Sequence, residues 1–319
     1  MRVDTPADSP AGPTRRSLVL AFAAIYLIWG STYLGIRVAI QTMPPFLMAG
    51  SRFLISGMLL FIVLLARGAA WPTARQWRDQ AIVGVFLFLG GNAIVSWAEL
   101  HTPSGITCLV LGSSPIVVIF MDWVRPHGQR PTMPLLVGVA VGLGGIALLL
   151  DPRSIPAGYR PPVIDLIALW ASSICWWIGS FYSKHSAAKT PLVMASSMQM
   201  LSGCVSILLV GWLLGEGRGF RITAVSRESW LAFSYLVVVG GIIAFPVYVW
   251  LLENSTPAKV STFAYVNPVV AVILGWALLG EPLNLRMILA TGIIVGAVAI
   301  ISIIKTRPSP EAKATTRGQ

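Results

Sequence analysis

Ten long, mainly apolar runs follow one another along the 319 residues of this chain. A helix needs roughly 20 mainly apolar residues to cross about 30 Å of hydrocarbon, and each run comes close to that length. Short segments with turn residues, such as TMPP and GEPLN, separate the runs. The composition agrees, because 55% of the residues are hydrophobic and only 11% are charged, too few for a water-exposed surface. The sequence therefore predicts an all-α polytopic membrane protein with ten transmembrane helices. The predicted spans are residues 18–38, 46–66, 80–99, 104–122, 133–150, 163–183, 191–214, 229–251, 257–279 and 285–304.

The positive charges predict how the chain is oriented. If both termini are cytoplasmic, the cytoplasmic flanks carry 14 Lys and Arg and the opposite flanks carry 6, with Arg37, Arg52 and Lys259 inside or at the edges of spans. Cytoplasmic segments of membrane proteins carry the excess of Lys and Arg. We therefore expect cytoplasmic N- and C-termini, with residues 1–17 and 305–319 as disordered, polar tails.

Two segments far apart in the sequence repeat each other. PFLMAGSRFLISG at 45–57 and PLVMASSMQMLSG at 191–203 share six of thirteen residues without a gap. ELHTP at 99–103 returns as ENSTP at 253–257. Glycine pairs in the third and eighth spans, and GxxxG motifs in the fifth and tenth, keep the same order. The common order over two halves indicates a duplication.

The duplication predicts two inverted five-helix repeats. The first repeat covers residues 18–150, a periplasmic linker covers 151–162, and the second repeat covers 163–304. Because five is odd, the second unit enters the membrane in the opposite direction to the first. Inverted repeats of this kind are typical of transporters, where two similar units support one conformation open to each side.

Four segments resemble a known family. IYLIWGSTYLGIRVAI, PPFLMAGSRFLISG, TPSG followed by SSP, and AYVNPVVAVILGWALLGEPL are similar to EamA-type permeases of the drug/metabolite transporter superfamily, and the resemblance covers roughly residues 20–304. It implies a ten-helix carrier of the bacterial inner membrane, usually an exporter of amino acids or other small metabolites. Sugar-phosphate and nucleotide-sugar antiporters and multidrug exporters resemble the same fold, so the substrate stays open.

Arg52 is a charged residue six positions into the second predicted span, about 9 Å below the outer edge. A charged group at such depth in a membrane is energetically costly, so its presence needs a structural or functional explanation. One interpretation is an ion pair with Glu99, near Arg37, that orders three helix ends. The other is that Arg52 faces a cavity and binds an anionic group of the substrate. The second repeat has Met198 at the matching position, so only the first repeat needs this charge. The first span contains no Asp or Glu, unlike small multidrug exporters of the superfamily, which leaves uncoupled transport or coupling through Glu99.

Other polar and aromatic residues inside spans are candidates for the substrate site. Pro115 and Pro268 lie in the fourth and ninth spans, where each predicts a helix kink and frees a backbone carbonyl. Tyr265 and Asn267 lie beside Pro268, so kinking and binding are both open interpretations there. The remaining substrate-binding candidates are Trp29, Asn92, Trp97, Trp176 and Tyr248, with Trp177 as a further deep tryptophan.

Four glycines are predicted to serve helix packing between the fifth and tenth spans. They are Gly138, Gly142, Gly292 and Gly296. The histidines show no metal-ligand spacing and the chain has no phosphate-binding loop motif, so we expect no metal and no cofactor.

The expected partners are a small-molecule substrate and the lipid bilayer, without nucleic acid. A single chain is expected to suffice, with a homodimer as the alternative. A membrane-embedded enzyme would need a catalytic set inside the spans, and we find none. A structural or signalling membrane protein neither needs nor excludes the repeat. A sugar-phosphate antiporter would need several basic residues near the midplane, where only Arg52 qualifies.

Overall fold

The computed structural model describes residues 13–102, 107, 110–124, 130–149, 161–186, 190–279 and 285–303. These residues form helices joined by turns and short connections, without a strand in the described ranges, and every predicted span contains helix. Six helical stretches are long and apolar enough to cross a membrane, and others are shorter apolar helices. Large apolar side chains such as Leu27, Ile62 and Val205 are exposed on the outside of the bundle, as expected for a surface in contact with lipid.

The first repeat begins with two long helices that have clear start signals. The side chain of Thr14 accepts a hydrogen bond from the backbone N–H of Ser17 and so caps the first helix. Pro45 occupies the first turn of the second helix, where its missing N–H costs no hydrogen bond. The described elements of this repeat are α1 (Arg15–Ala39), α2 (Pro45–Ala66), α3 (Ala74–Gly84), η1 (Val85–Ala93), α4 (Ile94–Ala98), α6 (Ser114–Val124) and α7 (Met133–Leu149).

The second repeat follows the same plan. Its elements are α8 (Val163–Ser186), α9 (Leu192–Leu213), a short 3₁₀ turn η3 (Ile222–Ala224), α10 (Arg227–Tyr235), η4 (Leu236–Ala244), α11 (Phe245–Asn254), α12 (Pro257–Val260), α13 (Phe263–Leu279) and α14 (Leu285–Ile303). The ninth span is broken at Ser261 and Thr262, between α12 and α13. Pro268 lies farther along, inside α13. The kink at Pro268 stays a prediction, whereas Pro115 is the second residue of α6, where a proline is well tolerated.

The third and eighth spans each contain a π-helical segment in the middle. η1 joins α3 to α4, and η4 joins α10 to α11. Each of these two spans is therefore a continuous helix made of three segments. The glycine pairs of the two repeats, Gly90–Gly91 and Gly240–Gly241, lie inside these segments. π-segments are rare and concentrate at functional sites. Their matching positions show the same local structure in both repeats.

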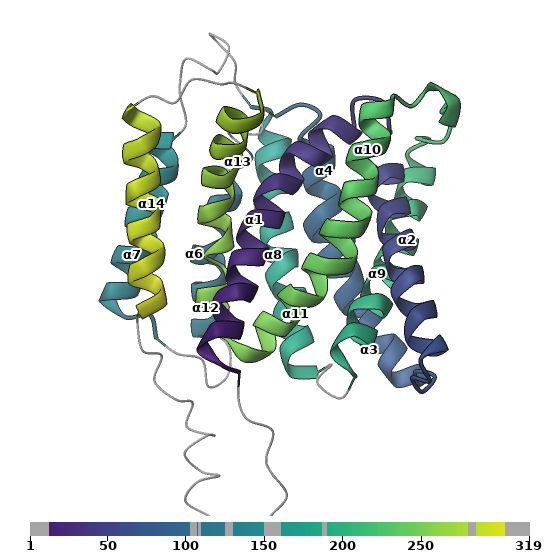
Figure 1. Cartoon of the computed structure of the whole chain (residues 1–319), viewed down its shortest axis with the longest axis horizontal. Coiled ribbons are helices and arrows are strands. Elements are labelled where there is room, and N and C mark those ends of the chain that lie inside the picture. Colours follow the sequence, from purple (N-terminus) through teal and green to yellow (C-terminus); the bar gives the residue numbers. More distant parts are fainter. Residues whose placement is uncertain are drawn as a thin grey trace, which may run out of the picture.

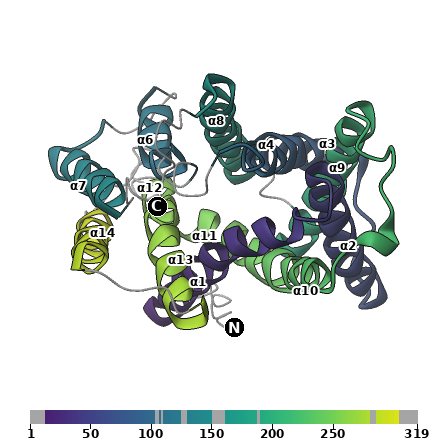
Figure 2. The same cartoon turned by 90° about the horizontal axis from the view of Figure 1, so that it is seen from above.

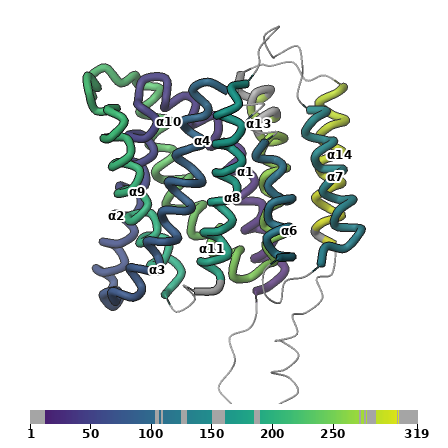
Figure 3. Tube along the Cα trace, turned by 180° about the vertical axis from the view of Figure 1, so that it is seen from behind, coloured from purple at the N-terminus to yellow at the C-terminus, as the bar shows by residue number. Residues whose placement is uncertain are grey.

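The contacts between helices come in pairs that a twofold relation would produce. α2 packs along α9, and α7 packs along α14, so that equivalent helices of the two repeats face each other. Likewise α1 packs against η4 and α13, and its counterpart α8 packs against η1 and α6. Seen from above, α7 and α14 form one end of the elongated bundle and α2 with α9 the other (Figure 2). The view from behind shows the same arrangement (Figure 3).

Small residues allow α2 and α9 to approach closely. A Cβ added at Gly50 would lie 2.6 Å from Cδ2 of Leu208, and one added at Gly211 would lie 2.9 Å from Cβ of Phe46. Both distances are too short for ordinary contact. Close approach through glycine is a common way to pack helices in membranes, and here it joins the two repeats.

The prediction that four GxxxG glycines pack the fifth span against the tenth was wrong at three of the four positions. Gly138 of α7 does pack on α14, since an added Cβ would lie 2.9 Å from Cγ1 of Ile301. At Gly142 an added Cβ would instead lie 2.9 Å from Cζ of Tyr265 on α13. Gly292 and Gly296 are exposed, and an added Cβ at either would meet no atom within 4 Å. α14 uses larger side chains toward α7 and turns its glycines outward.

Candidate functional site

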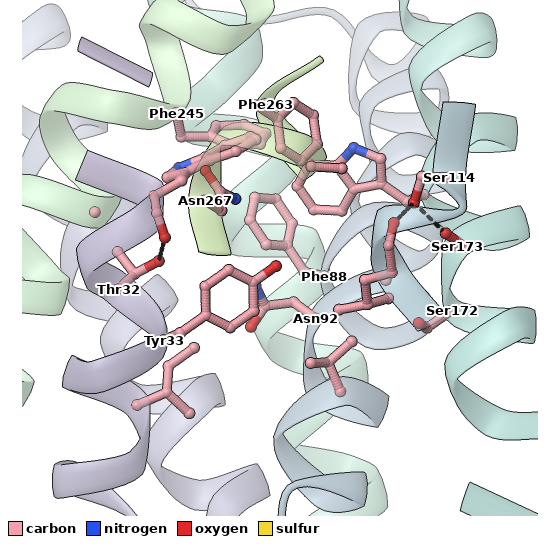
Figure 4. Close-up of a pocket in the computed structure, with 18 of the residues that line it drawn as sticks. Thr32, Tyr33, Phe88, Asn92, Ser114, Ser172, Ser173, Phe245, Phe263 and Asn267 are labelled. Atoms are coloured by element: carbon pink, nitrogen blue, oxygen red, sulfur yellow. Dashed lines mark hydrogen bonds between the residues drawn. The ribbon is translucent and has the colours of Figure 1, made fainter. Parts of the chain in front are cut away.

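A cavity of about 110 Å³ lies inside the bundle between the two repeats. One water takes about 30 Å³ in the liquid, so the cavity has room for more than a single water. Its walls come from helices of both repeats, including α1, η1, α8 and α13 (Figure 4). The aromatic residues that line it are Trp29, Tyr33, Phe53, Phe88, Trp176, Phe245 and Phe263. The polar and charged ones are Thr32, Arg52, Asn92, Ser114, Ser172, Ser173 and Asn267.

Among the described residues that line the cavity, Arg52 is the one that carries a charge. It is only 4% exposed, and its Nη2 donates a hydrogen bond to Oδ1 of Asn92. Its Cζ also lies 4.3 Å from the centre of the Phe53 ring, a distance typical of a cation–π contact. The Nε atom is buried without a hydrogen-bond partner. The guanidinium is therefore held in place by neutral groups.

The ion pair between Arg52 and Glu99 is not present. Their charged atoms do not approach within 4.0 Å, and Arg52 bonds to Asn92 on the neighbouring η1 instead. Both carboxylate oxygens of Glu99 are buried without a hydrogen-bond partner, and Arg37 is exposed. The reason is geometric: Asn92 lies about two helical turns before Glu99 and faces Arg52 across the cavity, within reach of its side chain. The interpretation that an Arg52–Glu99 ion pair orders three helix ends was therefore wrong, because the two residues do not form this pair.

Asn267 is the second polar group in the cavity that stands out. Its side chain is 2% exposed, and neither the Nδ2 nor the Oδ1 atom has a hydrogen-bond partner. The hydroxyl groups around it are already occupied. Thr32 donates to the carbonyl of Trp29 over 2.8 Å, and Ser114 and Ser173 bond to each other over 2.5 Å (Figure 4). Buried amides without partners are costly, so Asn267 offers one donor and one acceptor to a cavity occupant.

An aromatic layer closes one side of the cavity. It consists of Trp29, Trp176, Tyr248 and Phe263, whose ring centres lie 4.8–6.1 Å apart. The hydroxyl of Tyr248 accepts from Nε1 of Trp176 over 2.8 Å and is 2.7 Å from Oγ of Ser180. This layer joins α1, α8, α11 and α13, and so ties the two repeats together.

Further contacts lie beyond the aromatic layer, toward the first turns of α1. Tyr26, about one turn before Trp29, hydrogen-bonds Thr262 over 2.5 Å. Lys184 donates to the carbonyl of Ser255 over 2.7 Å near the end of α8. On the other side of the layer, the cavity lining continues as far as Ile36 and Val95, near the opposite ends of their helices. The cavity therefore extends from the middle of the bundle toward the end where α1 finishes, the upper end in Figure 1.

The structure places five of the eight predicted substrate-binding residues in the cavity wall. These are Trp29, Arg52, Asn92, Trp176 and Asn267. Three others lie elsewhere. Tyr248 belongs to the aromatic layer behind the cavity wall, Tyr265 packs on α7 with its hydroxyl 3.4 Å from the carbonyl of Val139, and Trp97 stacks edge-on against His101. The further deep tryptophan, Trp177, is buried beside Phe181 rather than in the cavity.

Sequence reasoning did not identify several residues of the wall, among them Tyr33, Phe88, Ser172 and Ser173. For two further wall residues, both glycines, the sequence did contain a signal. Gly91 and Gly240, from the two glycine pairs, both line the cavity, so the repeated pairs mark the two π-segments that face it. The wall is also chemically asymmetric. Met198, the counterpart of Arg52, is fully buried and packs with Phe61 and Met194 instead.

Comparison with known proteins identifies the family. The model of the EamA-like transporter family matches this chain twice, over residues 16–151 and 164–303. The chain belongs to the EamA-like transporter family. It is therefore a multi-pass membrane transporter built from two repeats, as the sequence predicted. Membership of a transporter family is compatible with the expectation that the protein is not an enzyme.

Named relatives extend over almost the whole chain. The uncharacterized inner membrane transporter YedA of Escherichia coli K12 is 37% identical over 287 residues, which cover 89% of this chain and 90% of YedA. The uncharacterized transporter YvbV of Bacillus subtilis is 25% identical and covers 91% of this chain and 92% of its own length. A solved crystal structure with 21% sequence identity superposes with a TM-score of 0.74 over 91% of this chain and 98% of that one, which shows the same fold.

Proposed function

We propose that this protein is a secondary carrier that exports a small organic metabolite with an anionic group, such as an amino acid, across the bacterial inner membrane. The observation that carries the proposal is the state of Arg52. Its guanidinium is almost fully buried in the cavity wall, it bonds only to neutral Asn92, and its Nε lacks a partner. A buried cation without a counter-ion is costly. A carboxylate on the substrate would supply the missing charge and accept from the free donors.

The rest of the cavity favours a small and partly apolar cargo. Aromatic side chains make up much of its wall, and Asn267 offers a free donor and a free acceptor away from the charge. A cationic drug would meet Arg52, and the described part of the wall contains no acidic residue. A sugar phosphate with two negative charges would find one cation where it needs more. The single charge supports a monoanion or a zwitterion.

The inverted repeat supports alternating access. In this conformation the aromatic layer separates the cavity from the side where α1 begins, which the distribution of Lys and Arg predicts to be cytoplasmic. Because the two repeats have the same fold in opposite orientations, an exchange of their local conformations would close the other side and open this one. The described wall residues come from both repeats, and we propose that a single chain is the working unit.

A counterflow experiment in proteoliposomes tests the proposed substrate class. Vesicles loaded with a mixture of amino acids and small organic acids are compared with vesicles loaded with their amides or methyl esters, which have the same shape without the carboxylate. We expect exchange of labelled cargo for at least one free acid and a loss of roughly tenfold or more for its amide or ester, since a charged hydrogen bond contributes about 1.5–3 kcal/mol. Equal exchange of an acid and its ester would contradict the proposal.

A further inference from the structure

Glu99 is a buried carboxyl group that the transport site described above does not use. It follows the last residue of α4, and neither Oε1 nor Oε2 has a hydrogen-bond partner or measurable exposure. It does not line the cavity, although Val95, one turn earlier on the same helix, does. An ionised carboxylate removed from water needs hydrogen-bond donors or a cation in contact. Glu99 has neither.

Among the residues that the structure describes, the charged groups around Glu99 are few. Arg37 of α1 and Arg52 of α2 are the cations whose charge acts on it, and neither makes a contact with its oxygens. On its own segment, His101 faces away toward Asp165 of α8, with Nδ1 and Oδ2 3.8 Å apart. Asp165 is in turn bonded by Thr102 over 2.8 Å. Burial of both carboxylate oxygens without a donor favours the neutral form, and the two arginines oppose it from a distance.

We propose that Glu99 is a proton-binding site that is occupied in this conformation and empties when the end of α4 becomes hydrated. The proton comes from the aqueous phase at the end where α1 finishes, binds one carboxylate oxygen, and returns to water from the same group. Binding of the proton then stabilises the conformation in which the cavity extends toward Ile36. In a carrier this links the conformational equilibrium to the proton gradient. The link to cargo rests on the proposed function, but the proton site does not.

The repeat supplies a matched control. Glu253 is the counterpart of Glu99 in the motif shared by ELHTP and ENSTP, and it lies in the last turn of α11. Glu253 is exposed to solvent. Glu253→Gln therefore removes the equivalent carboxyl from an exposed position and leaves the buried carboxyl of Glu99 in place. Glutamine in place of Glu99 has nearly the shape of the protonated acid and should be tolerated.

Infrared difference spectroscopy tests the proton site without any cargo. Purified protein in lipid nanodiscs is titrated from about pH 7 to about pH 10, a range in which ordinary carboxyl groups are already ionised. We expect the carbonyl stretch of a protonated carboxylic acid to disappear over this range in the wild type and in Glu253→Gln. In Glu99→Gln this change should be absent, and the protein should be at least as stable as the wild type at the alkaline end.

Three results would overturn the inference. The first is no such band in the wild type at about pH 7, and the second is a band that persists in Glu99→Gln. The third is a Glu99→Gln protein that is less stable than the wild type at alkaline pH. A failed cargo assay in a protein that shows the Glu99 band would contradict the proposed substrate and not the proton site, so the two proposals fail separately.

Discussion

Arg52 on α2 donates a hydrogen bond to Asn92 on η1 inside a cavity between two inverted repeats. Neither half of this pair exists in the second repeat, where Met198 stands at the place of Arg52 and Ile242 follows the glycine pair at the place of Asn92. The repeats thus share their helices, their π-segments and their packing, but in the described part of the cavity wall the charge comes from the first repeat. A symmetric frame with an asymmetric wall suits a cargo with one charged end.

We expect Tyr248→Phe to weaken the aromatic layer that closes one side of the cavity. The substitution keeps the ring but removes the hydroxyl that bonds Trp176 and Ser180. Two hydrogen bonds at about 0.5–1.5 kcal/mol each are lost, and the two partners stay buried. The melting temperature in detergent should therefore fall, by several degrees at most for a chain of this size. An unchanged melting temperature for Tyr248→Phe would show that this layer is held by ring packing alone.

The location of the helices was predictable from the sequence, whereas the faces they present were not. The second span was predicted at 46–66 and is observed at Pro45–Ala66. The third begins earlier than predicted, at Ala74, because Thr73 and Gln76 form a capping box in front of a polar first turn that hydropathy does not detect. An apolar run identifies a helix. When that helix is apolar on all sides, the run does not show which side faces the protein interior.

One of the misplaced candidates follows a π-segment. Asn92 lies within η1 and lines the cavity, and so does Val95 after it, but Trp97 packs against His101. No periodicity in VFLFLGGNA marks the π-helical segment, so the sequence did not predict which side chains around it face the cavity. Arg52, in contrast, lies in regular helix, and its prediction as a cavity residue depended on charge alone.

The two GxxxG motifs should respond differently to substitution. Gly142→Leu would drive its side chain into the ring of Tyr265, which already lies 2.9 Å from an added Cβ. Overpacking of this kind typically costs about 1–3 kcal/mol, so the folded yield in detergent should fall. Gly296→Leu faces open space and should fold like the wild type. A loss of yield for Gly296→Leu would show that this face of α14 is covered by a neighbour, and a second copy of the chain would be the first to test by cross-linking.

Glu216 provides a prediction about pH. It lies in the loop after α9, between Gly215 and Gly219, whose φ values of 78° and 80° suit glycine. Its carboxylate accepts from the backbone N–H groups of Phe46 and Leu47 over 3.2 and 2.9 Å, at the start of α2. Burial raises the pKa of Glu216 above its ordinary value of 4.5, and these two hydrogen bonds offset part of the effect.

The sign of the pH effect follows from the raised pKa. A carboxyl group that binds its proton more tightly in the folded state stabilises the protein less as the pH rises from its ordinary pKa through its folded pKa. The melting temperature of the wild type should therefore fall over this window relative to that of Glu216→Gln, which cannot titrate. Thermal unfolding of both proteins across the window measures the difference. A difference that is constant with pH, or that grows in favour of the wild type, would contradict the burial argument.

The central claim is that Arg52 binds the anionic group of the cargo. Transport of the acid identified by counterflow should be measured for Arg52→Met, for Arg52→Met/Glu99→Gln, and for the exposed control Arg67→Met, together with their melting temperatures. We predict that all three fold, that Arg67→Met transports like the wild type, and that Arg52→Met loses roughly tenfold or more of the transport rate at low substrate concentration. The double variant should not recover it, because Arg52 and Glu99 do not form an ion pair. Full transport by Arg52→Met would contradict the account.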